Sequence, residues 1–192
     1  MLEAFLVSTG VVALAEIGDK TQLLALLLAA KFRKPIPIVL GILAATLVNH
    51  TIAGAVGAWL ASLIGPVGLR WVLGVSFIGM ALWTLVPDKY EEQNVAPPRF
   101  GVFITTLLAF FLVEMGDKTQ IATAALAAKY QSLQSVVAGT TLGMMIADVP
   151  AVWLGELAAT KLPLKLVRSV AAAIFGVLGV LVLFGPNFSL GH

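Results

Sequence analysis

Cysteine is absent from this chain of 192 residues, and charged residues make up only 11% of it. Without cysteine there are no disulfides, thiolate metal sites or cysteine nucleophiles. A soluble domain carries about 25% charged residues, so the low charge argues against a soluble protein. The few basic residues form no stripe interleaved with aromatic residues, so nucleic acid is not an expected partner.

Apolar residues, in contrast, account for 59% of the chain, and the mean hydropathy is +0.99. Several apolar runs exceed the roughly 20 residues that a helix needs to cross about 30 Å of hydrocarbon. Helices are expected because a chain in lipid must satisfy its own backbone hydrogen bonds. We therefore predict an all-α integral membrane protein with six transmembrane helices, at residues 4–29, 37–63, 68–87, 101–128, 134–159 and 165–185.

The two halves of the chain resemble each other when residue n is set against residue n+98. EIGDKTQLLALLLAAK (16–31) then aligns with EMGDKTQIATAALAAK (114–129), with ten of sixteen positions identical. Three spans per half is an odd number, so the second half must enter the membrane from the opposite side. Such inverted repeats are typical of secondary transporters. We predict two inverted three-helix repeats, at 1–87 and 101–192, joined by a cytoplasmic linker at 88–100.

The distribution of basic residues predicts the orientation. If both termini are non-cytoplasmic, the cytoplasmic connections contain Lys31, Arg33, Lys34, Lys89, Arg99, Lys161, Lys165 and Arg168. The opposite side has only Arg70 and Lys129. The excess of Lys and Arg on cytoplasmic loops in membrane proteins therefore favours non-cytoplasmic termini. The tryptophans, Trp83 among them, mostly fall near span ends and are typical of interfacial anchors.

Charged residues occur in the middle of the first and fourth predicted spans. Each motif places two acids and a lysine at i, i+3 and i+4, which is one face of a helix: Glu16, Asp19 and Lys20, then Glu114, Asp117 and Lys118. A buried charge costs about 2.5–3.5 kcal/mol, so six unpaired charges would cost on the order of 15–20 kcal/mol. A purely structural role, in which acid–lysine pairs lock two helices together, leaves the excess of acids over bases unexplained. The excess charge matches one divalent cation.

Oxygen ligands from carboxylates and amides suit hard cations such as Ca²⁺, Mg²⁺ and Mn²⁺. The predicted metal ligands are Glu16, Asp19, Gln22, Glu114, Asp117 and Gln120. Supporting roles are predicted for Lys20, Thr21, Lys118 and Thr119. The lysines are expected to hold a carboxylate in place or to act as internal cations in the empty site. Metal and protons would compete for the same carboxylates, and the preferred proton carriers are Glu16 and Glu114.

Glycines and further polar residues complete the predicted interior. A helix break at Gly18 and Gly116 could expose backbone carbonyls and a helix end to an ion. Asn49 and His50 lie mid-span in the second predicted helix, and the offset of 98 places His50 on Asp148 in the fifth. Both a supporting or proton-relay role and a plain hydrogen bond to a neighbouring helix remain open for these residues.

The twin motifs EIGDKT and EMGDKT resemble the E-x-G-D-[KR]-[TS] pattern of the cation/proton exchanger family of Golgi membranes, chloroplasts and bacteria. Its bacterial members include MneA-type manganese exporters, and the resemblance covers essentially the whole chain. It implies export of Mn²⁺, and in some members Ca²⁺, from the cytosol in exchange for protons. By motif position it assigns metal binding to Glu16, Asp19, Glu114 and Asp117. Mn²⁺ or Ca²⁺ is then a transported substrate, with no permanently bound cofactor, and the expected membrane is a bacterial inner membrane or a thylakoid.

Two other functions are compatible with six spans of which some contain polar residues near their middle. The first is a transporter of another small solute, such as an amino acid, which Mn²⁺ competition would distinguish. The second is a membrane-embedded enzyme or assembly factor. An enzyme favours an asymmetric constellation with an activated nucleophile, whereas here the polar groups are duplicated. We therefore expect a transporter and not an enzyme, whose partners are the lipid bilayer, divalent cations and protons.

Overall fold

The computed structural model describes residues 1–86, 100–154 and 164–185, and these ranges contain helices but no strand. The central linker predicted at 88–100 lies outside the described residues except for its last residue. The helices are α1 (Leu2–Glu16), α2 (Lys20–Phe32), α3 (Pro35–Leu63), α4 (Pro66–Leu85), α5 (Gly101–Glu114), α6 (Lys118–Tyr130), α7 (Leu133–Leu154) and α9 (Leu164–Phe184).

Four helices in the described ranges are each long and apolar enough to cross a membrane. They comprise Pro35–Leu63, Pro66–Leu85, Leu133–Trp153 and Lys165–Phe184, with 29, 20, 21 and 20 residues. At 1.5 Å per residue, 20 residues extend about 30 Å, the thickness of the hydrocarbon core. Prolines at the first turns of α3 and α4 start these helices, where the missing proline N–H has no helical partner to lose.

The predicted spans 4–29 and 101–128 are not continuous helices. The first is divided into α1 and α2, of 15 and 13 residues, and the second into α5 and α6, of 14 and 13 residues. Each piece is only about 20–22 Å long, shorter than the hydrocarbon core. The interruption expected at Gly18 and Gly116 is therefore present, and both breaks fall inside the E-x-G-D-K-T motifs.

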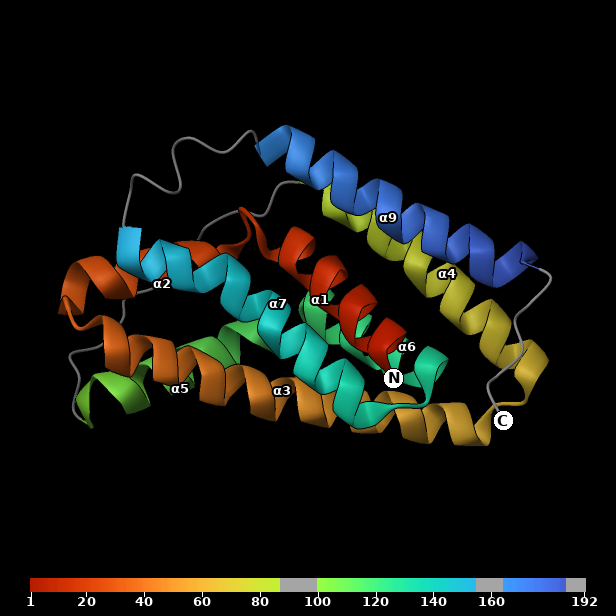
Figure 1. Ribbon diagram of the computed structural model, residues 1–192, viewed down its shortest axis with the longest axis horizontal. Helices are drawn as coiled ribbons and strands as arrows, with labels where there is room; N and C mark the ends of the chain where they lie inside the picture. The colour runs from red at the N-terminus through yellow and green to blue at the C-terminus, as the bar shows by residue number, and fades with distance from the viewer. Residues whose placement is uncertain (87–99, 155–163, 186–192) are drawn as a thin grey trace.

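Helices from the first half of the chain pack mainly against helices from the second half. α1 packs against α7, and α3 packs against α5 and α6 (Figure 1). α4 and α9 lie side by side at one edge, where the rings of Phe77 and Phe175 stack with centroids 6.5 Å apart. Most of the interior is therefore built between the two halves, not within each half.

Two glycines that are counterparts at the offset of 98 allow close approaches between these helices. A Cβ added to Gly41 of α3 would lie 2.9 Å from the carbonyl oxygen of Phe103 in α5. A Cβ added to Gly139 of α7 would lie 2.4 Å from the carbonyl oxygen of Phe5 in α1. Phe5 and Phe103 are also counterparts, so the same helix contact occurs twice. Small residues allow such close backbone approach in membrane helix packing.

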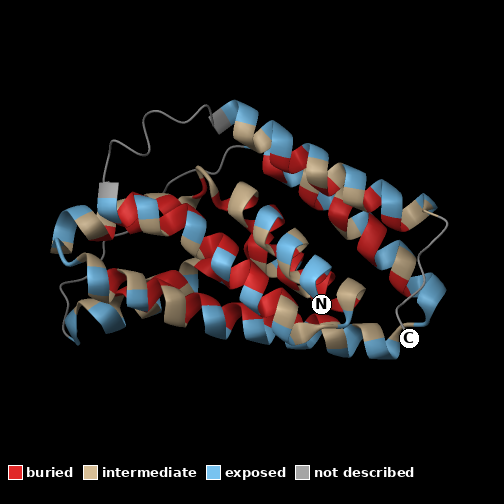
Figure 2. Ribbon diagram, viewed as in Figure 1, coloured by how far each residue is buried: buried red, intermediate tan, exposed pale blue. Residues whose placement is uncertain are grey.

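Figure 2 shows which parts of each helix are buried and which are exposed. Many large apolar side chains are exposed, whereas several charged residues are buried. Large apolar side chains such as Val67, Trp71 and Phe184 are 73%, 57% and 72% exposed. Among the residues that the structure describes, the buried titratable ones are Glu16, Asp19, His50, Glu114, Asp117, Lys118 and Asp148. A surface of this kind suits lipid as the surrounding solvent, and the polar interior locates the candidate site.

Candidate metal centre

The first motif forms a turn between α1 and α2. α1 ends at Glu16 and α2 begins at Lys20, and Gly18 adopts a φ of 81°. This left-handed conformation is open to glycine but costs other residues energy because of their Cβ. The N–H of Asp19 donates to the Glu16 carbonyl at 3.0 Å, and the N–H of Gly18 donates to Oε1 of Gln22 at 2.9 Å. The motif's own glutamine thus satisfies a backbone group that the break exposes.

The second motif repeats this turn between α5 and α6. Gly116 has a φ of 77°, and its N–H donates to Oε1 of Gln120 at 2.7 Å. The N–H of Asp117 donates to the Glu114 carbonyl at 3.1 Å. Both turns therefore have the same glycine conformation and the same two hydrogen bonds, as expected from their matching residues.

The prediction that each acid–acid–lysine set shares one helical face is wrong. The i, i+3, i+4 rule requires a continuous helix, but the first helix stops at Glu16 and the next starts at Lys20. Asp19 and Asp117 are instead the N-cap residues of α2 and α6, with extended backbone and no side-chain hydrogen bond to the cap. Each aspartate carboxylate is thus available for contacts across the interior.

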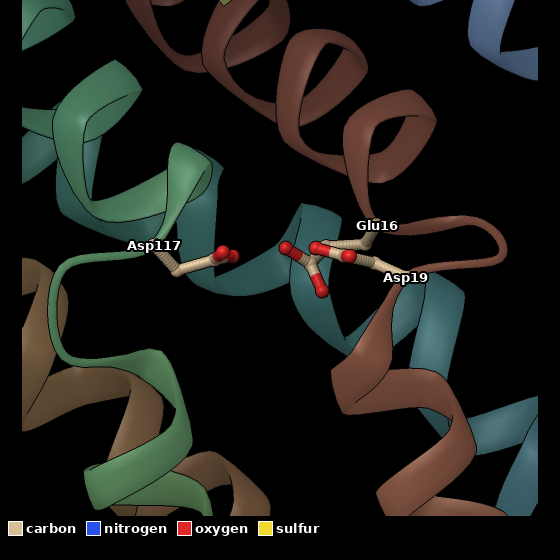
Figure 3. Close-up of side chains that lie close together, drawn as sticks. All are labelled: Glu16, Asp19 and Asp117. Carbon is tan, nitrogen blue, oxygen red and sulfur yellow. The ribbon is translucent and has the colours of Figure 1, made fainter. Parts of the chain in front are cut away.

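Three carboxylates from the two motifs converge. One oxygen each from Glu16, Asp19 and Asp117 lies within 4.8 Å of the others, and the three residues are 0%, 2% and 1% exposed. Figure 3 shows these side chains pointing toward one another from opposite sides of the interior. Oxygen ligands on opposite sides of a calcium ion lie about 4.6–5.2 Å apart, from bonds of 2.3–2.6 Å. The spacing is therefore within reach of a single ion.

Two lysines pair with these aspartates, each across to the other motif. Nζ of Lys20 lies 3.0 Å from Oδ1 of Asp117, and Nζ of Lys118 lies 3.6 Å from Oδ1 of Asp19. The two lysine side chains differ in exposure, at 31% for Lys20 and 4% for Lys118. Two ammonium groups against three carboxylates leave a formal charge of −1, so this cluster retains an attraction for cations.

Glu114 lies outside the three-carboxylate cluster and faces α3. Its Oε2 is 3.7 Å from Nε2 of His50, and both side chains are fully buried. Within the described ranges, neither carboxylate oxygen of Glu114 or Asp148 has a hydrogen-bond partner, and neither ring nitrogen of His50 has one. Asn49 is engaged, because its Nδ2 donates to the Phe111 carbonyl at 3.1 Å. The ligand role of Glu114 and the relay roles of His50 and Asp148 stay predictions.

The chain matches the family model described as "Divalent cation/proton antiporter GDT1" over residues 4–92 and 102–188. The two matched segments include both motifs, both breaks and nearly every helix described above. This chain belongs to the GDT1 family. GDT1 is a family of membrane transporters, and the four apolar helices of sufficient length agree with an integral membrane protein.

Relatives of this GDT1-family protein occur in bacteria and plants. A protein of Vibrio cholerae serotype O1 named "Putative manganese exporter" is 51% identical over 176 residues, covering 91% of this chain and 88% of the relative. A GDT1-like protein of Synechocystis is 28% identical over 91% of this chain and 94% of its own length. The GDT1-like protein 4 of Oryza sativa subsp. indica is 27% identical over 91% of this chain and 71% of its own length. No solved structure matches the chain.

The threonines and glutamines of the GDT1 motifs position the acids and the turns. The Thr21 hydroxyl donates to Oε2 of Glu16, whereas the Thr119 hydroxyl donates to Oδ2 of Asp117 at 3.5 Å. Nε2 of Gln22 donates to a carbonyl oxygen of α7 at 3.0 Å. Because an amide oxygen has two lone pairs, the hydrogen bond from Gly18 does not prevent this glutamine from binding a cation. The predicted ligand roles of the two glutamines therefore stay predictions.

Two residues near this GDT1 site were not among the predicted site residues. Nζ of Lys118 lies 5.9 Å from the ring centroid of Trp83, a residue interpreted from sequence as an interfacial anchor. Nη2 of Arg168 donates to the carbonyl oxygen of Gly18 at 3.4 Å. The sequence does contain one indication for Trp83: the offset of 98 aligns it with Leu181, so the two halves differ in residue type at this position. Helical periodicity alone could not indicate either contact.

Proposed function

We propose that this GDT1-family protein exports Mn²⁺ from the cytosol in exchange for protons, with Ca²⁺ as a second cargo. The observation that carries the proposal is the meeting of Glu16, Asp19 and Asp117 within 4.8 Å, all buried. Carboxylate oxygens are ligands suited to both ions. The Vibrio cholerae relative, named as a manganese exporter, favours Mn²⁺ as the main cargo.

The proposed binding site is centred on these three carboxylates. Glu114, Gln22 and Gln120 are proposed as further oxygen ligands, recruited as the two motifs move relative to each other. Lys20 and Lys118 act as internal cations that compensate the carboxylates until the cargo arrives. Their ion pairs with Asp117 and Asp19, at 3.0 and 3.6 Å, support this role, because an ammonium group and a metal ion compete for the same oxygen atoms.

The proposed coupling follows from competition at the carboxylates. A carboxylate must be deprotonated to bind a metal ion, so metal binding releases protons. Glu16 and Glu114 are proposed as the proton carriers, since both are fully buried and each has a carboxylate oxygen with no hydrogen-bond partner in the described ranges. We propose that the binding site can switch between facing the cytoplasm and facing the opposite side only when these carboxylates are neutralised by metal or by protons. Exchange of metal for protons then becomes obligatory.

The proposed architecture is six spans in two inverted repeats, with α1–α2 and α5–α6 each forming one interrupted span. Several matched features support it. Gly18 and Gly116 share a positive φ, and Arg33 and Gln131 share a left-handed C-cap with the same hydrogen bond to a carbonyl four residues earlier. Interrupted helices that meet at mid-membrane are a recurrent way of building ion sites in transporters. Both termini are proposed to be non-cytoplasmic.

Transport by purified protein in proteoliposomes tests this function. Vesicles are loaded with a pH-sensitive dye, the membrane potential is clamped with potassium and valinomycin, and Mn²⁺ is added outside. We expect Mn²⁺ entry together with alkalinisation of the lumen, both absent from protein-free vesicles. A parallel series with Ca²⁺ and Mg²⁺ measures selectivity.

The possible failures of this experiment are distinct. Mn²⁺ entry without opposing proton movement would contradict the exchange mechanism and reduce the protein to a uniporter or channel. Absence of Mn²⁺ entry, with transport of another solute that Mn²⁺ does not inhibit, would contradict the proposed cargo.

A further inference from the structure

A lysine beside a metal ligand poses a physical problem for a cation transporter. Lys118 pairs with Asp19 at 3.6 Å, and its side chain is only 4% exposed. When a dication binds to Asp19, the ammonium group must leave the carboxylate, but a buried cation cannot move to water at low cost. The Lys20 side chain is less enclosed, at 31% exposed. A contact elsewhere inside the protein that stabilises the ammonium group would lower the cost of displacing Lys118 from Asp19.

Trp83 of α4 is placed to make such a contact. The ammonium nitrogen of Lys118 lies 5.9 Å from the indole centroid, within the distance at which a cation is attracted to an aromatic face. The same ammonium is farther from its aspartate than Lys20 is from Asp117, at 3.6 against 3.0 Å. The Lys118 ammonium group is thus within reach of both the carboxylate and the ring.

We propose that Trp83 is a positioning residue for cation binding: its indole ring holds the Lys118 ammonium group when the cargo takes the Asp19 carboxylate. The proposal rests on the proposed function of the site. It assigns to α4, which supplies none of the carboxylates, a direct influence on the affinity for the transported cation.

The difference between the two halves supports this assignment. The counterpart of Trp83 at the offset of 98 is Leu181, which has no aromatic face to offer Lys20. The ring of the first half thus faces the buried lysine of the second half, whereas the second half has leucine at the equivalent position and the lysine of the first half is partly exposed. The two lysines therefore have different surroundings, and only Lys118 of the two is proposed to move onto the ring of Trp83.

The first test compares Trp83→Leu with Trp71→Leu by measuring initial rates of Mn²⁺ uptake into proteoliposomes. Trp71 is the matched control because it lies on the same helix and is 57% exposed. We expect Trp83→Leu to raise the half-saturating Mn²⁺ concentration about threefold to tenfold, from the usual strength of cation–π contacts, while the maximal rate changes less than twofold. Trp83→Phe keeps an aromatic face and should restore most of the affinity. Equal behaviour of Trp83→Leu and the control would overturn the proposal.

A double-mutant cycle separates positioning from general packing. If Trp83 acts through the ammonium group, Trp83→Leu should have no further effect in a Lys118→Gln background. An equal rise in the half-saturating concentration in both backgrounds would overturn the proposal, since the ring would then act without the lysine. The thermal midpoint of each variant in detergent identifies any misfolded protein, and Trp83→Phe keeps the test decisive if Trp83→Leu misfolds.

Equilibrium binding distinguishes failure of this inference from failure of the proposed function. The electron paramagnetic resonance signal of free Mn²⁺ reports binding to detergent-solubilised protein without any transport. If the wild type binds Mn²⁺ but does not exchange it for protons, the exchange proposal fails while the effect of Trp83→Leu on Mn²⁺ affinity still tests the inference. If transport is intact and the affinity is unchanged in Trp83→Leu, the inference alone fails.

Discussion

Asp19 and Asp117 occupy the N-cap positions of α2 and α6, yet neither carboxylate caps its helix. An aspartate at this position usually accepts a hydrogen bond from the first helical turn, which contributes about 1 kcal/mol. Here the carboxylates pair across the interior with the lysines of the opposite motif. The stabilising N-cap hydrogen bond is thus missing from both α2 and α6, as expected where these side chains serve a binding site.

The residue-scale prediction concerns Asp117→Asn. The change removes one carboxylate from the cluster and the partner of Lys20 at 3.0 Å. We expect Mn²⁺ uptake in proteoliposomes to fall at least about thirtyfold, which corresponds to about 2 kcal/mol for one contact with a charged group. Glu3→Gln makes the same chemical change at an exposed position and should transport normally. Uptake by Asp117→Asn close to that of the control would contradict the assignment of this ligand.

At this scale the sequence predicted which acids meet better than it predicted how the side chains pair. Acids in the middle of apolar runs were expected to converge, and Glu16, Asp19 and Asp117 do lie together; that they bind a cation stays a prediction. The position of Glu114 against His50 and that of Trp83 over Lys118 could not be predicted. Each of these contacts joins residues far apart in the chain, so neither follows from spacing within one helix.

Helices α1, α2, α5 and α6 owe their ends to the glycine of each motif. Gly18 and Gly116 turn the chain with positive φ, and a glutamine side chain accepts a hydrogen bond from each glycine N–H. The sequence predicted where the breaks occur but also predicted shared helical faces across them. The two expectations exclude each other, because a break interrupts the helix between Glu16 and Lys20. The break is present, and the shared face is not.

The element-scale prediction compares Gly116→Ala with Gly10→Ala. A Cβ would meet nothing within 4 Å at either position, but only Gly116 has a positive φ, of 77°. We expect Gly116→Ala to lose about 1–2 kcal/mol of stability from the left-handed backbone, seen as a thermal midpoint lower by about 2–8 °C. Gly10→Ala, within α1, should be neutral or stabilising by up to about 1 kcal/mol. Equal thermal midpoints for the two variants would contradict a left-handed backbone conformation at Gly116.

The whole molecule is held together by contacts between its two halves. α1 packs on α7, α3 on α5 and α6, and α4 on α9. The three converging carboxylates likewise come from both halves, with Asp117 facing Glu16 and Asp19. The site therefore exists only when both halves are folded on each other. The boundaries of the repeats, at 1–87 and 101–192, stay a prediction.

The whole-molecule prediction concerns the course of the chain through the membrane. Because the natural chain has no cysteine, a single introduced cysteine reports its own position. Leu2→Cys lies at the start of α1, 71% exposed, and Lys34→Cys lies between α2 and α3. If α1 and α2 form one interrupted span, a membrane-impermeant maleimide should label Leu2→Cys from the non-cytoplasmic side and Lys34→Cys from the cytoplasmic side.

The alternative outcomes of this labelling are equally clear. Labelling of both cysteines from one side would mean that α1 and α2 enter and leave the membrane on the same face, which contradicts the six-span arrangement. Labelling of the two cysteines from opposite sides, but with the sides exchanged, would contradict only the predicted orientation. The unmodified chain, which has no thiol, is the control for background reaction.

The sequence by itself determined that the chain is apolar and helical, that its charges occur in two matching motifs, and that each motif contains a glycine able to break a helix. These properties are local, since they depend on composition, spacing and the conformational freedom of single residues. Only the tertiary structure decided that Glu16, Asp19 and Asp117 meet, that Lys20 and Lys118 pair crosswise with the aspartates, and that Lys118 lies near the ring of Trp83. Such contacts depend on how helices that are distant in the chain pack against one another, which no local pattern specifies.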